Sequence, residues 1–573
     1  MSLFTFNKLN KPIGEFRFTI QLAIFATMGS IEKRYVTTIS GRLDRRKSSL
    51  STNGKRIRKY CREYCEYTGI HGMRYFGEKR SAFEKICWVA VFVTSLLVCL
   101  AVIYQTYRKW QHQPLMVNFS SNERNINEIP FPAVTICQET RVSRSFFNYS
   151  RALRNYVFEG KADADDLKKL RYMSLLCAAG KIFKHKIPNV TTIDEDFYKF
   201  LADGATQFLE SCTWMGEKMS CREIFRPIVT DEGLCYTFNM LENDDIFSNV
   251  SFVPNFNHPT ASDGLYSNTK LWSVDNGYSD DAPVHTYPRR ALLSGYTNAL
   301  VVNLKINISD IDYACTSFQG YQVVLHQAIR YPIVQIHHFR VPIRKAVIVA
   351  ISPTQMENSE EVNDYSLDKR DCFLQGEKML KFFKNYTQNN CELECVANLT
   401  LSKCGCVAFY MPRENSTKIC GNQRMDCITT VKNKMNTRKL ELSLDEDRCN
   451  RRRNPHNECN CLPMCAQINY DTEITEIEYD RRKEYESLEM CNSTEQDHHA
   501  WSQLVIYFKS SYFIPHVRSE LYGHLDFLAN VGGLLGLFIG FSLLSLFEII
   551  YFASVRIICN TKMYKKWYGE HNN

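Results

Sequence analysis

Residues 528–552 read LANVGGLLGLFIGFSLLSLFEIIYF. The stretch is apolar enough to enter a membrane, although it carries four glycines and a single glutamate, Glu548. Phe527–Phe547 contains no charged residue over 21 positions, and Ile86–Tyr107 contains none over 22. A spanning helix needs about 20 apolar residues. The sequence therefore predicts two transmembrane helices, over residues 86–107 and 527–555, on either side of a large middle segment.

Basic residues gather at both ends of the chain. Residues 1–85 carry 18 Lys and Arg against 7 Asp and Glu, and residues 556–573 carry 4 against 1. Lys and Arg favour the cytosolic side of a membrane. We therefore expect a multi-pass plasma-membrane protein with residues 1–85 and 556–573 cytosolic and 108–526 outside. The basic run Lys55–Arg62 then favours orientation and lipid headgroups over nucleic acid, because a membrane helix follows it closely.

The middle segment has two features of an extracellular domain. It contains 18 of the 23 cysteines, an even number that suits a disulfide framework in an oxidising compartment. It also contains all nine Asn-x-Ser/Thr acceptor sites, and neither tail contains one. We expect glycosylation at Asn118, Asn148, Asn189, Asn249, Asn307, Asn385, Asn398, Asn415 and Asn492.

Local patterns predict a disulfide-rich, mixed α+β domain. Short β-rich runs occur at Ala299–Ile306, Tyr321–Leu325 and Lys345–Ile351, between turn-rich stretches typical of an antiparallel sheet. Apolar residues at helical spacing predict a helix over Phe373–Phe383. The cysteine block Cys372–Cys465 favours nested disulfides that join two helices or strands as a rigid lever. A zinc site at the late cysteines of this block is the less favoured alternative, since extracellular thiols oxidise.

Several motifs stand in a fixed order along the chain: His71-Gly72, FPAVTIC (Phe131–Cys137), GLCYTFN (Gly233–Asn239), GYQVVLH (Gly320–His326), CELEC with CGC (Cys391–Cys406), CNCLPMC (Cys459–Cys465) and GLLGLFIGFSLLSLFE (Gly533–Glu548). Together they resemble the degenerin/epithelial sodium channel family, and most closely its pickpocket-type subunits. The resemblance covers nearly everything from His71 to Phe552.

The resemblance implies an acid-sensing-channel-like trimer, homomeric or heteromeric with related subunits, around one pore. It implies a pore-forming subunit of a sodium-selective, amiloride-sensitive channel, gated through its extracellular domain by a mechanical, osmotic or chemical stimulus. Such a channel passes Na⁺ inward, depolarises the cell and needs no cofactor or metal. The resemblance further implies the pairs Cys137–Cys235, Cys212–Cys221, Cys372–Cys465, Cys391–Cys461, Cys395–Cys459 and Cys404–Cys449. Cys406 would pair with Cys420 or Cys427, and Cys177, Cys315 and Cys491 stay unassigned.

The glycines of the opening stretch have a role in this framework. Gly532, Gly536 and Gly540 recur every four residues and share one helical face, where small residues let membrane helices approach. Gly540-Phe541-Ser542 resembles the family's selectivity filter. Backbone carbonyls can line a filter only where the helix is broken. Packing alone, or a continuous helix in which Ser542 bonds back to its own backbone, remains the alternative.

Other positions carry expectations from the same resemblance. Ala529 matches the degenerin position, where a bulky side chain should hold the gate open, and His71-Gly72 matches a gating motif. Three copies of Glu548 would form an acidic ring below the filter that concentrates cations, unless Glu548 only marks the helix end. Asn530 stands where acid-gated members have Asp, and Leu367–Cys372 (LDKRDC) lacks their aromatic residue. Proton gating by that route is therefore not expected.

Three alternatives stay open at this point. The first is an auxiliary subunit that conducts only in heteromers. The second is a nucleotide-gated two-helix trimeric channel, against which the filter and cysteine order argue. The third is a non-conducting glycoprotein or ectoenzyme, although no H-E-x-x-H, G-x-S-x-G or P-loop motif is present. The stimulus, and an extracellular ligand or matrix partner, do not follow from these residues.

Overall fold

The computed structural model describes residues 43–112, 115–177, 186–254, 256, 271–274, 276–444, 459–488 and 498–568. The chain divides into two compact units: Met1–Arg108 with His524–Asn573, and Lys109–Gly523. The two ends of the chain therefore share one unit, and the segment between them forms the other. Asn492, Cys449 and Cys491 lie outside the described residues.

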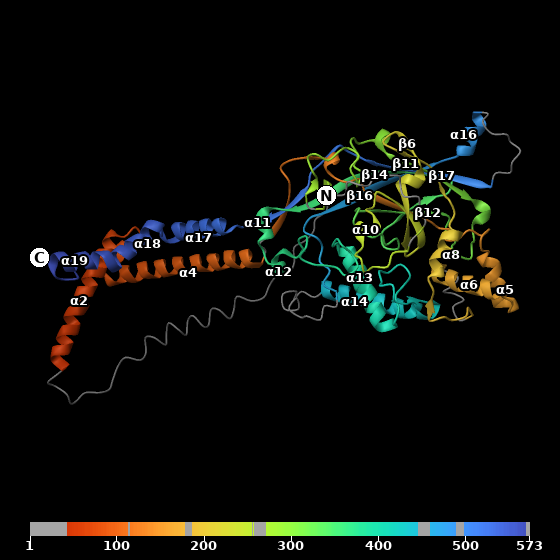
Figure 1. Ribbon diagram of the computed structural model, residues 1–573. Helices are drawn as coiled ribbons and strands as arrows, with labels where there is room; N and C mark the ends of the chain where they lie inside the picture. The colour runs from red at the N-terminus through yellow and green to blue at the C-terminus, as the bar shows by residue number, and fades with distance from the viewer. Residues whose placement is uncertain are drawn as a thin grey trace, which may run out of the picture. The chain divides into compact units, whose positions relative to one another are not determined.

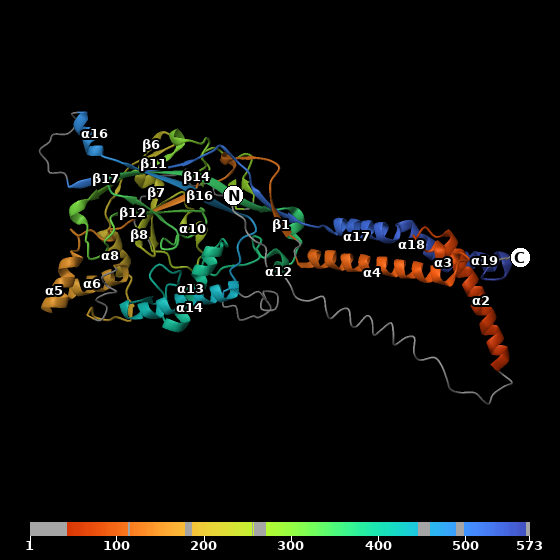
Figure 2. The same ribbon diagram turned by 180° about the vertical axis from the view of Figure 1, so that it is seen from behind.

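The first unit is helical. Its elements are α2 (Leu43–Tyr67), α3 (Arg74–Gly77), α4 (Ala82–His112), α17 (His524–Ile539), α18 (Leu543–Ile550), the π-helical turn η6 (Tyr551–Val555) and α19 (Arg556–Tyr564). α4 and α17 lie side by side (Figures 1 and 2), and the Ser95 hydroxyl of α4 donates to the carbonyl of Phe538 at 2.8 Å. Ala82–Gln111 and Leu543–Tyr564 are long and apolar enough to span a membrane, while α17 is a shorter apolar helix. The predicted second helix is thus several helical pieces.

Two sheets dominate the large unit. The larger has the strand order β1 (Leu115–Phe119), β19 (His516–Glu520), β14 (Lys345–Asn358), β17 (His499–Phe508), β11 (Leu300–Asn307), β5 (Leu209–Trp214) and β6 (Glu217–Met219), with β16 (Gln467–Glu478) also paired to β14. The smaller has the order β13 (Phe339–Pro342), β12 (Gly320–His326), β3 (Ala133–Gln138), β8 (Gly233–Phe238) and β7 (Phe225–Thr230). The three β-rich runs of the sequence are therefore confirmed as β11, β12 and the first half of β14. The larger sheet is mixed rather than antiparallel as expected, because β14 pairs in parallel with β17 and β19.

The main hydrophobic core draws on both sheets. Leu300 and Leu504 of the larger sheet belong to the same buried cluster as Val134 and Phe238 of the smaller. β11 shows why: its burial alternates residue by residue, as expected for a strand with one face in a core. The apolar residues at every second position of β11 thus pack in the core that the two sheets share.

Shorter elements surround the sheets. The helices are α5 (Tyr149–Glu159), α6 (Ala164–Leu176), α8 (Asp196–Gly204), α9 (Cys221–Ile224), α10 (Asn243–Ile246), α11 (Glu360–Asn363), α12 (Leu367–Arg370), α13 (Gln388–Cys404), α14 (Met425–Leu444) and α16 (Arg481–Ser487). The short strands are β2 (Arg124–Asn125), β4 (Thr192–Ile193), β9 (Trp272–Ser273), β10 (Gly277–Tyr278), β15 (Ile419–Cys420) and β18 (Tyr512–Phe513), and 3₁₀ turns lie at Ile126–Glu128, Tyr296–Asn298, Ile308–Asp310 and Asn422–Arg424. α5, α6 and α8 contribute to a second buried cluster, and α13 packs on α14.

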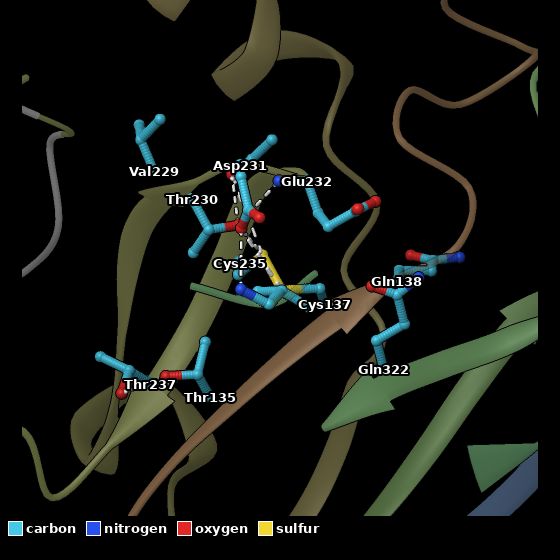
Figure 3. The surroundings of a disulfide bond; sticks show 12 residues. Thr135, Cys137, Gln138, Val229, Thr230, Asp231, Glu232, Cys235, Thr237 and Gln322 are labelled. Atoms are coloured by element: carbon cyan, nitrogen blue, oxygen red, sulfur yellow. Dashed lines mark hydrogen bonds between the residues drawn. A yellow bond between two sulfur atoms is a disulfide. The ribbon is translucent and has the colours of Figure 1, made fainter. Parts of the chain in front are cut away.

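The first disulfide implied by the resemblance links the central strands of the smaller sheet. Cys137 of β3 is bonded to Cys235 of β8, and Figure 3 shows the Thr230 side chain beside the two sulfurs. The Thr230 hydroxyl lies 3.0 Å from the Cys235 sulfur. The strands that carry FPAVTIC and GLCYTFN are therefore fixed to each other covalently.

Disulfides also tie α13 to the segment before β16. The implied pairs Cys391–Cys461 and Cys395–Cys459 start from α13, and the implied pair Cys372–Cys465 joins a preceding turn to the same segment. The implied pair Cys212–Cys221 is also present and links β5 to α9. The three late cysteines are consumed by this ladder, so the zinc alternative is wrong. Such bridges each stabilise a domain by about 2–4 kcal/mol.

Two expectations need correction. Cys404 is bonded to Cys427 rather than to Cys449, which leaves Cys406 to Cys420. Cys404 ends α13 and Cys427 lies in the first turn of α14, so this bond joins the two helices where the chain turns between them. The unassigned Cys177 and Cys315 are bonded to each other.

The helix expected over Phe373–Phe383 is also wrong. The segment is a series of turns, with Gly376 at φ 79°. Phe373 bridges Met464 and Phe383 bridges Phe247, so these apolar residues are buried against separate partners. The spacing of the apolar residues suggested a helix. Gly376 in the middle of the segment was a signal against one, because glycine destabilises helices and readily adopts the left-handed conformation seen here.

Candidate pore site

The second predicted membrane helix is broken at Gly540. α17 ends at Ile539, Gly540 has a left-handed φ of 66°, and Ser542 is extended with φ −122° and ψ 172°. The Ser542 hydroxyl caps α18 by accepting the backbone N–H of Ser545 at 3.3 Å. Glycine adopts a left-handed conformation at the lowest cost. The predicted break is therefore confirmed, and the alternative of a continuous helix is wrong.

The histidine of the His-Gly pair lies against this break. The backbone N–H of His71 donates to the carbonyl of Ile539 at 2.9 Å. A Cβ added to Gly540 would lie 2.6 to 2.7 Å from three ring atoms of His71, closer than real Cβ atoms approach other atoms. Gly72 follows with φ 86°, a second left-handed residue. A helix end leaves its last carbonyls without intrahelical donors, and here the loop of residues 68–73 between α2 and α3 supplies one.

Glu548 contacts the same loop from the other side of the break. Its carboxylate accepts the backbone N–H of Gly69 at 3.1 Å and the Thr68 hydroxyl at 3.3 Å. The loop that carries His71 is thereby bonded to α17 through a carbonyl and to α18 through a carboxylate. The structure gives Glu548 a definite partner, which sequence reasoning did not find because the two positions are 479 residues apart.

A further contact joins α2 to the end of the second membrane segment. η6 is π-helical, and the Tyr60 hydroxyl donates to the carbonyl of Phe552 within it at 2.6 Å. The Tyr64 ring packs edge-to-face on the Phe552 ring at 5.3 Å, and Glu63 forms an ion pair with Arg556. π-helical turns often mark functional positions. These α2 residues carried no recognisable motif, so the sequence gave no signal for them.

The expected gate residues lie along α17. Ala529 and Asn530 are exposed in the single chain, and the Asn530 amide donates to the carbonyl of Asp526 at 3.0 Å. A Cβ added to Gly532 or Gly536 would meet nothing within 4 Å. This part of α17 therefore has open space around it within one subunit, in contrast to the crowded Gly540.

The predicted glycosylation sites differ in their exposure to solvent. Among the described asparagines of these sites, Asn118, Asn189, Asn249, Asn398 and Asn415 are exposed. The remaining three are half-buried: Asn148, Asn307 and Asn385. Asn148 also caps α5 by accepting a backbone N–H at 2.9 Å.

Two buried titratable groups are held by hydrogen bonds: His326 in β12 of the smaller sheet and Asp231 in the turn between β7 and β8. Burial lowers the pKa of His326 to about 3. Its Nε2 lies 2.8 Å from the Thr135 hydroxyl and its Nδ1 lies 2.9 Å from the carbonyl of Gln327, a pattern that suits the neutral ring. Burial raises the pKa of Asp231, although the backbone N–H of Val334 donates to this carboxylate at 2.8 Å. Within the described ranges, no group of three His, Cys, Asp or Glu could hold a metal ion.

Comparison with known proteins agrees with this geometry. The family model for the amiloride-sensitive sodium channel matches residues 64–552. Pickpocket protein 28 of Drosophila melanogaster is 26% identical over 87% of this chain and 79% of its own length. Sodium channel protein Nach of the same species is 21% identical over 88% of this chain and 89% of its own. Acid-sensing ion channel 4-B of Danio rerio is 21% identical over 85% and 74% respectively.

The matched region runs from α2 through the broken helix, so it includes both apolar segments and the whole disulfide-rich domain. Proteins of this family are plasma-membrane ion channels rather than enzymes, with two transmembrane helices per subunit, and they form trimers. This excludes the ectoenzyme and nucleotide-gated alternatives. The chain belongs to the amiloride-sensitive sodium channel family.

Proposed function

We propose that this chain is a pore-forming subunit of a sodium-selective, amiloride-blocked channel. In this proposal residues 1–85 and 556–573 are cytosolic, residues 108–526 are extracellular and glycosylated, and residues 86–107 and 527–555 cross the membrane. The channel is a trimer of this chain, or of this chain with related subunits. It passes Na⁺ inward when a stimulus acts on the extracellular domain.

The observation that carries the proposal is the helix break at Gly540 in an otherwise apolar segment. Broken backbone at membrane depth is tolerated only where it borders protein or water. A break lets backbone carbonyls and the hydroxyl of Ser542 face a narrow aqueous path, where they can replace part of an ion's hydration shell. We therefore assign Gly540, Phe541 and Ser542 to the selectivity filter.

The remaining site residues take roles around that filter. Ala529, Asn530 and Gly536 line the outer pore or gate, where the space around α17 leaves room for the other subunits. His71 and Gly72, in the loop of residues 68–73 between α2 and α3, support the filter. Glu548 contributes to an acidic ring below it, where three copies of the carboxylate would concentrate cations.

The test is whole-cell current from cells that express this chain with Ala529→Val. A branched side chain at this position should keep neighbouring helices apart and hold the pore open. We expect a constitutive inward current that disappears when external sodium is removed and falls when amiloride is added.

Ala101→Val is the matched control, because Ala101 is exposed on α4 and receives the same two methyl groups. It should reach the surface and give no constitutive current. An Ala529→Val chain that reaches the surface without current, alone and together with a related subunit, would contradict the pore-forming role. Current only on co-expression would identify an obligate heteromer.

A further inference from the structure

The first membrane helix carries a hydroxyl that reaches the broken helix. Ser95 of α4 donates from its Oγ to the carbonyl oxygen of Phe538 at 2.8 Å, two residues before Gly540. A serine inside a helix can instead bond back to the carbonyl four residues earlier in its own helix. Here the single hydroxyl proton of Ser95 is committed to α17. The bond therefore links the first membrane helix directly to the last turn before the break.

The packing of α4 on α17 sets the register of this bond. The two helices lie side by side (Figures 1 and 2), and the Tyr107 ring packs edge-to-face on the Phe527 ring at 6.3 Å. From Tyr107 back to Ser95, α4 covers about 18 Å at about 1.5 Å per residue. From Phe527 on to Phe538, α17 covers about 16 Å. The two contacts thus fit one antiparallel register, which places Ser95 opposite the end of α17.

The same face of α4 also contacts the segment that carries the His-Gly pair. Trp88, Phe92 and Ser95 follow one another at helical spacing and share one face of α4. The Trp88 ring stacks on the Tyr75 ring at 4.0 Å, and the Phe92 ring packs edge-to-face on the Phe76 ring at 5.9 Å. Both partner rings belong to α3, which follows the loop of residues 68–73. One face of α4 therefore contacts both α3 and the end of α17.

The backbone carbonyls around the break divide into two groups. Two of them are bonded from outside α17: the Phe538 carbonyl by Ser95, and the Ile539 carbonyl by the loop of residues 68–73. Among the residues that the structure describes, no donor reaches the carbonyls of Gly540 and Phe541. The oxygens of the assigned filter are thus open to an ion, while the two carbonyls just before them are occupied.

We propose that Ser95 is a positioning residue of the selectivity filter, which holds the Phe538 carbonyl against α4 and away from the ion path. The inference rests on the proposed function, because it takes Gly540, Phe541 and Ser542 as the filter. Selectivity in a carbonyl filter depends on its width or on the number of coordinating oxygens. Without the Ser95 hydroxyl, the freed carbonyl adds an oxygen or lets the break widen, and each change lowers the preference for Na⁺ over K⁺.

The test is the ratio of Na⁺ to K⁺ permeability, taken from the reversal potential of the current in the Ala529→Val background. Ser95→Ala removes the hydroxyl, and the ratio should fall about two- to threefold, the average worth of a hydrogen bond between membrane helices. Ser95→Thr keeps the hydroxyl and should keep the ratio. Thr94→Val is the matched control, because it removes a hydroxyl from the exposed neighbouring position of α4 and should leave the ratio unchanged.

The bond itself is measured apart from the current. In the detergent-solubilised channel, Ser95→Ala should lower the midpoint of thermal unfolding, whereas Ser95→Thr and Thr94→Val should not. A lower midpoint with an unchanged permeability ratio would show that Ser95 only joins the two helices, and would overturn the positioning role. An unchanged midpoint together with an unchanged ratio would overturn the bond as well.

A second variant covers the case in which Ser95→Ala does not reach the cell surface. Ser95→Cys keeps the size of the side chain and offers only a weak S–H donor. A lower permeability ratio in Ser95→Cys supports the proposal, and an unchanged ratio contradicts it. Absence of any current in the Ala529→Val background with Ser95 intact would instead count against the proposed function, and the unfolding comparison would still decide whether Ser95 holds α17.

Discussion

Replacement of Gly540 by alanine tests how the helix break between α17 and α18 is held. Two separate costs follow from the structure. Gly540 has φ 66°, and an L residue in this left-handed region costs about 1–2 kcal/mol. The new methyl group would also lie 2.6 Å from the His71 ring, and overpacking of this kind typically costs about 1–3 kcal/mol.

A double-mutant cycle with His71→Ala separates the two costs. Removal of the ring leaves the backbone cost and relieves the clash, so the coupling between the two substitutions should be about 1–3 kcal/mol. The assay is thermal unfolding of the detergent-solubilised channel, together with current in the Ala529→Val background. Gly54→Ala is the control, because a Cβ there meets nothing within 4 Å. A cycle in which Gly540→Ala costs the same with and without the ring would refute the contact between His71 and Gly540.

Three further predictions concern contacts away from the break at Gly540. Glu63→Arg and Arg556→Glu should each lower the unfolding temperature of the solubilised channel, and the charge-reversed pair should restore it, because the two side chains form a half-buried ion pair. Cys404→Ser and Cys427→Ser should each lower the free energy of unfolding by about 3 kcal/mol, and the double variant should lose no more than either single variant, because each change breaks the same disulfide. If the two cysteines belonged to different disulfides, the two losses would add. The pKa of His326 is about 3 in the folded chain and about 6.5 in the unfolded chain, so between these values only the unfolded chain binds the proton. The channel should therefore lose stability as pH falls from about 6.5 toward 3, and His326→Gln should weaken this pH dependence in unfolding scans.

Features that depend on local sequence were predicted well. The strands Ala299–Ile306 and Tyr321–Leu325 follow from alternating β-branched and aromatic residues, and the structure has β11 and β12 there. The break at Gly540 follows from the conformational freedom of glycine within an apolar helix. Each of these signals lies within a few residues of the feature that it predicts.

Contacts between distant segments could not be found in the same way. Nothing local to Glu548 indicates that its carboxylate accepts the N–H of Gly69, because a hydrogen bond across 479 residues depends on the whole helical unit. The choice of Cys427 over Cys449 as partner of Cys404 likewise depends on where α14 begins. The failed helix over Phe373–Phe383 shows the converse, since its apolar residues are buried by partners that periodicity does not reveal.

The loop of residues 68–73, between α2 and α3, is bonded to both sides of the helix break. A broken helix exposes backbone polar groups, and at membrane depth each unsatisfied group costs several kcal/mol. Here one loop meets both sides of the break: the N–H of His71 satisfies the carbonyl of Ile539 on α17, and the N–H of Gly69 binds the carboxylate of Glu548 on α18. Because these two N–H groups are only two residues apart, α17 and α18 cannot move independently without loss of one bond. A change in the geometry of the break at Gly540 must therefore also move this loop.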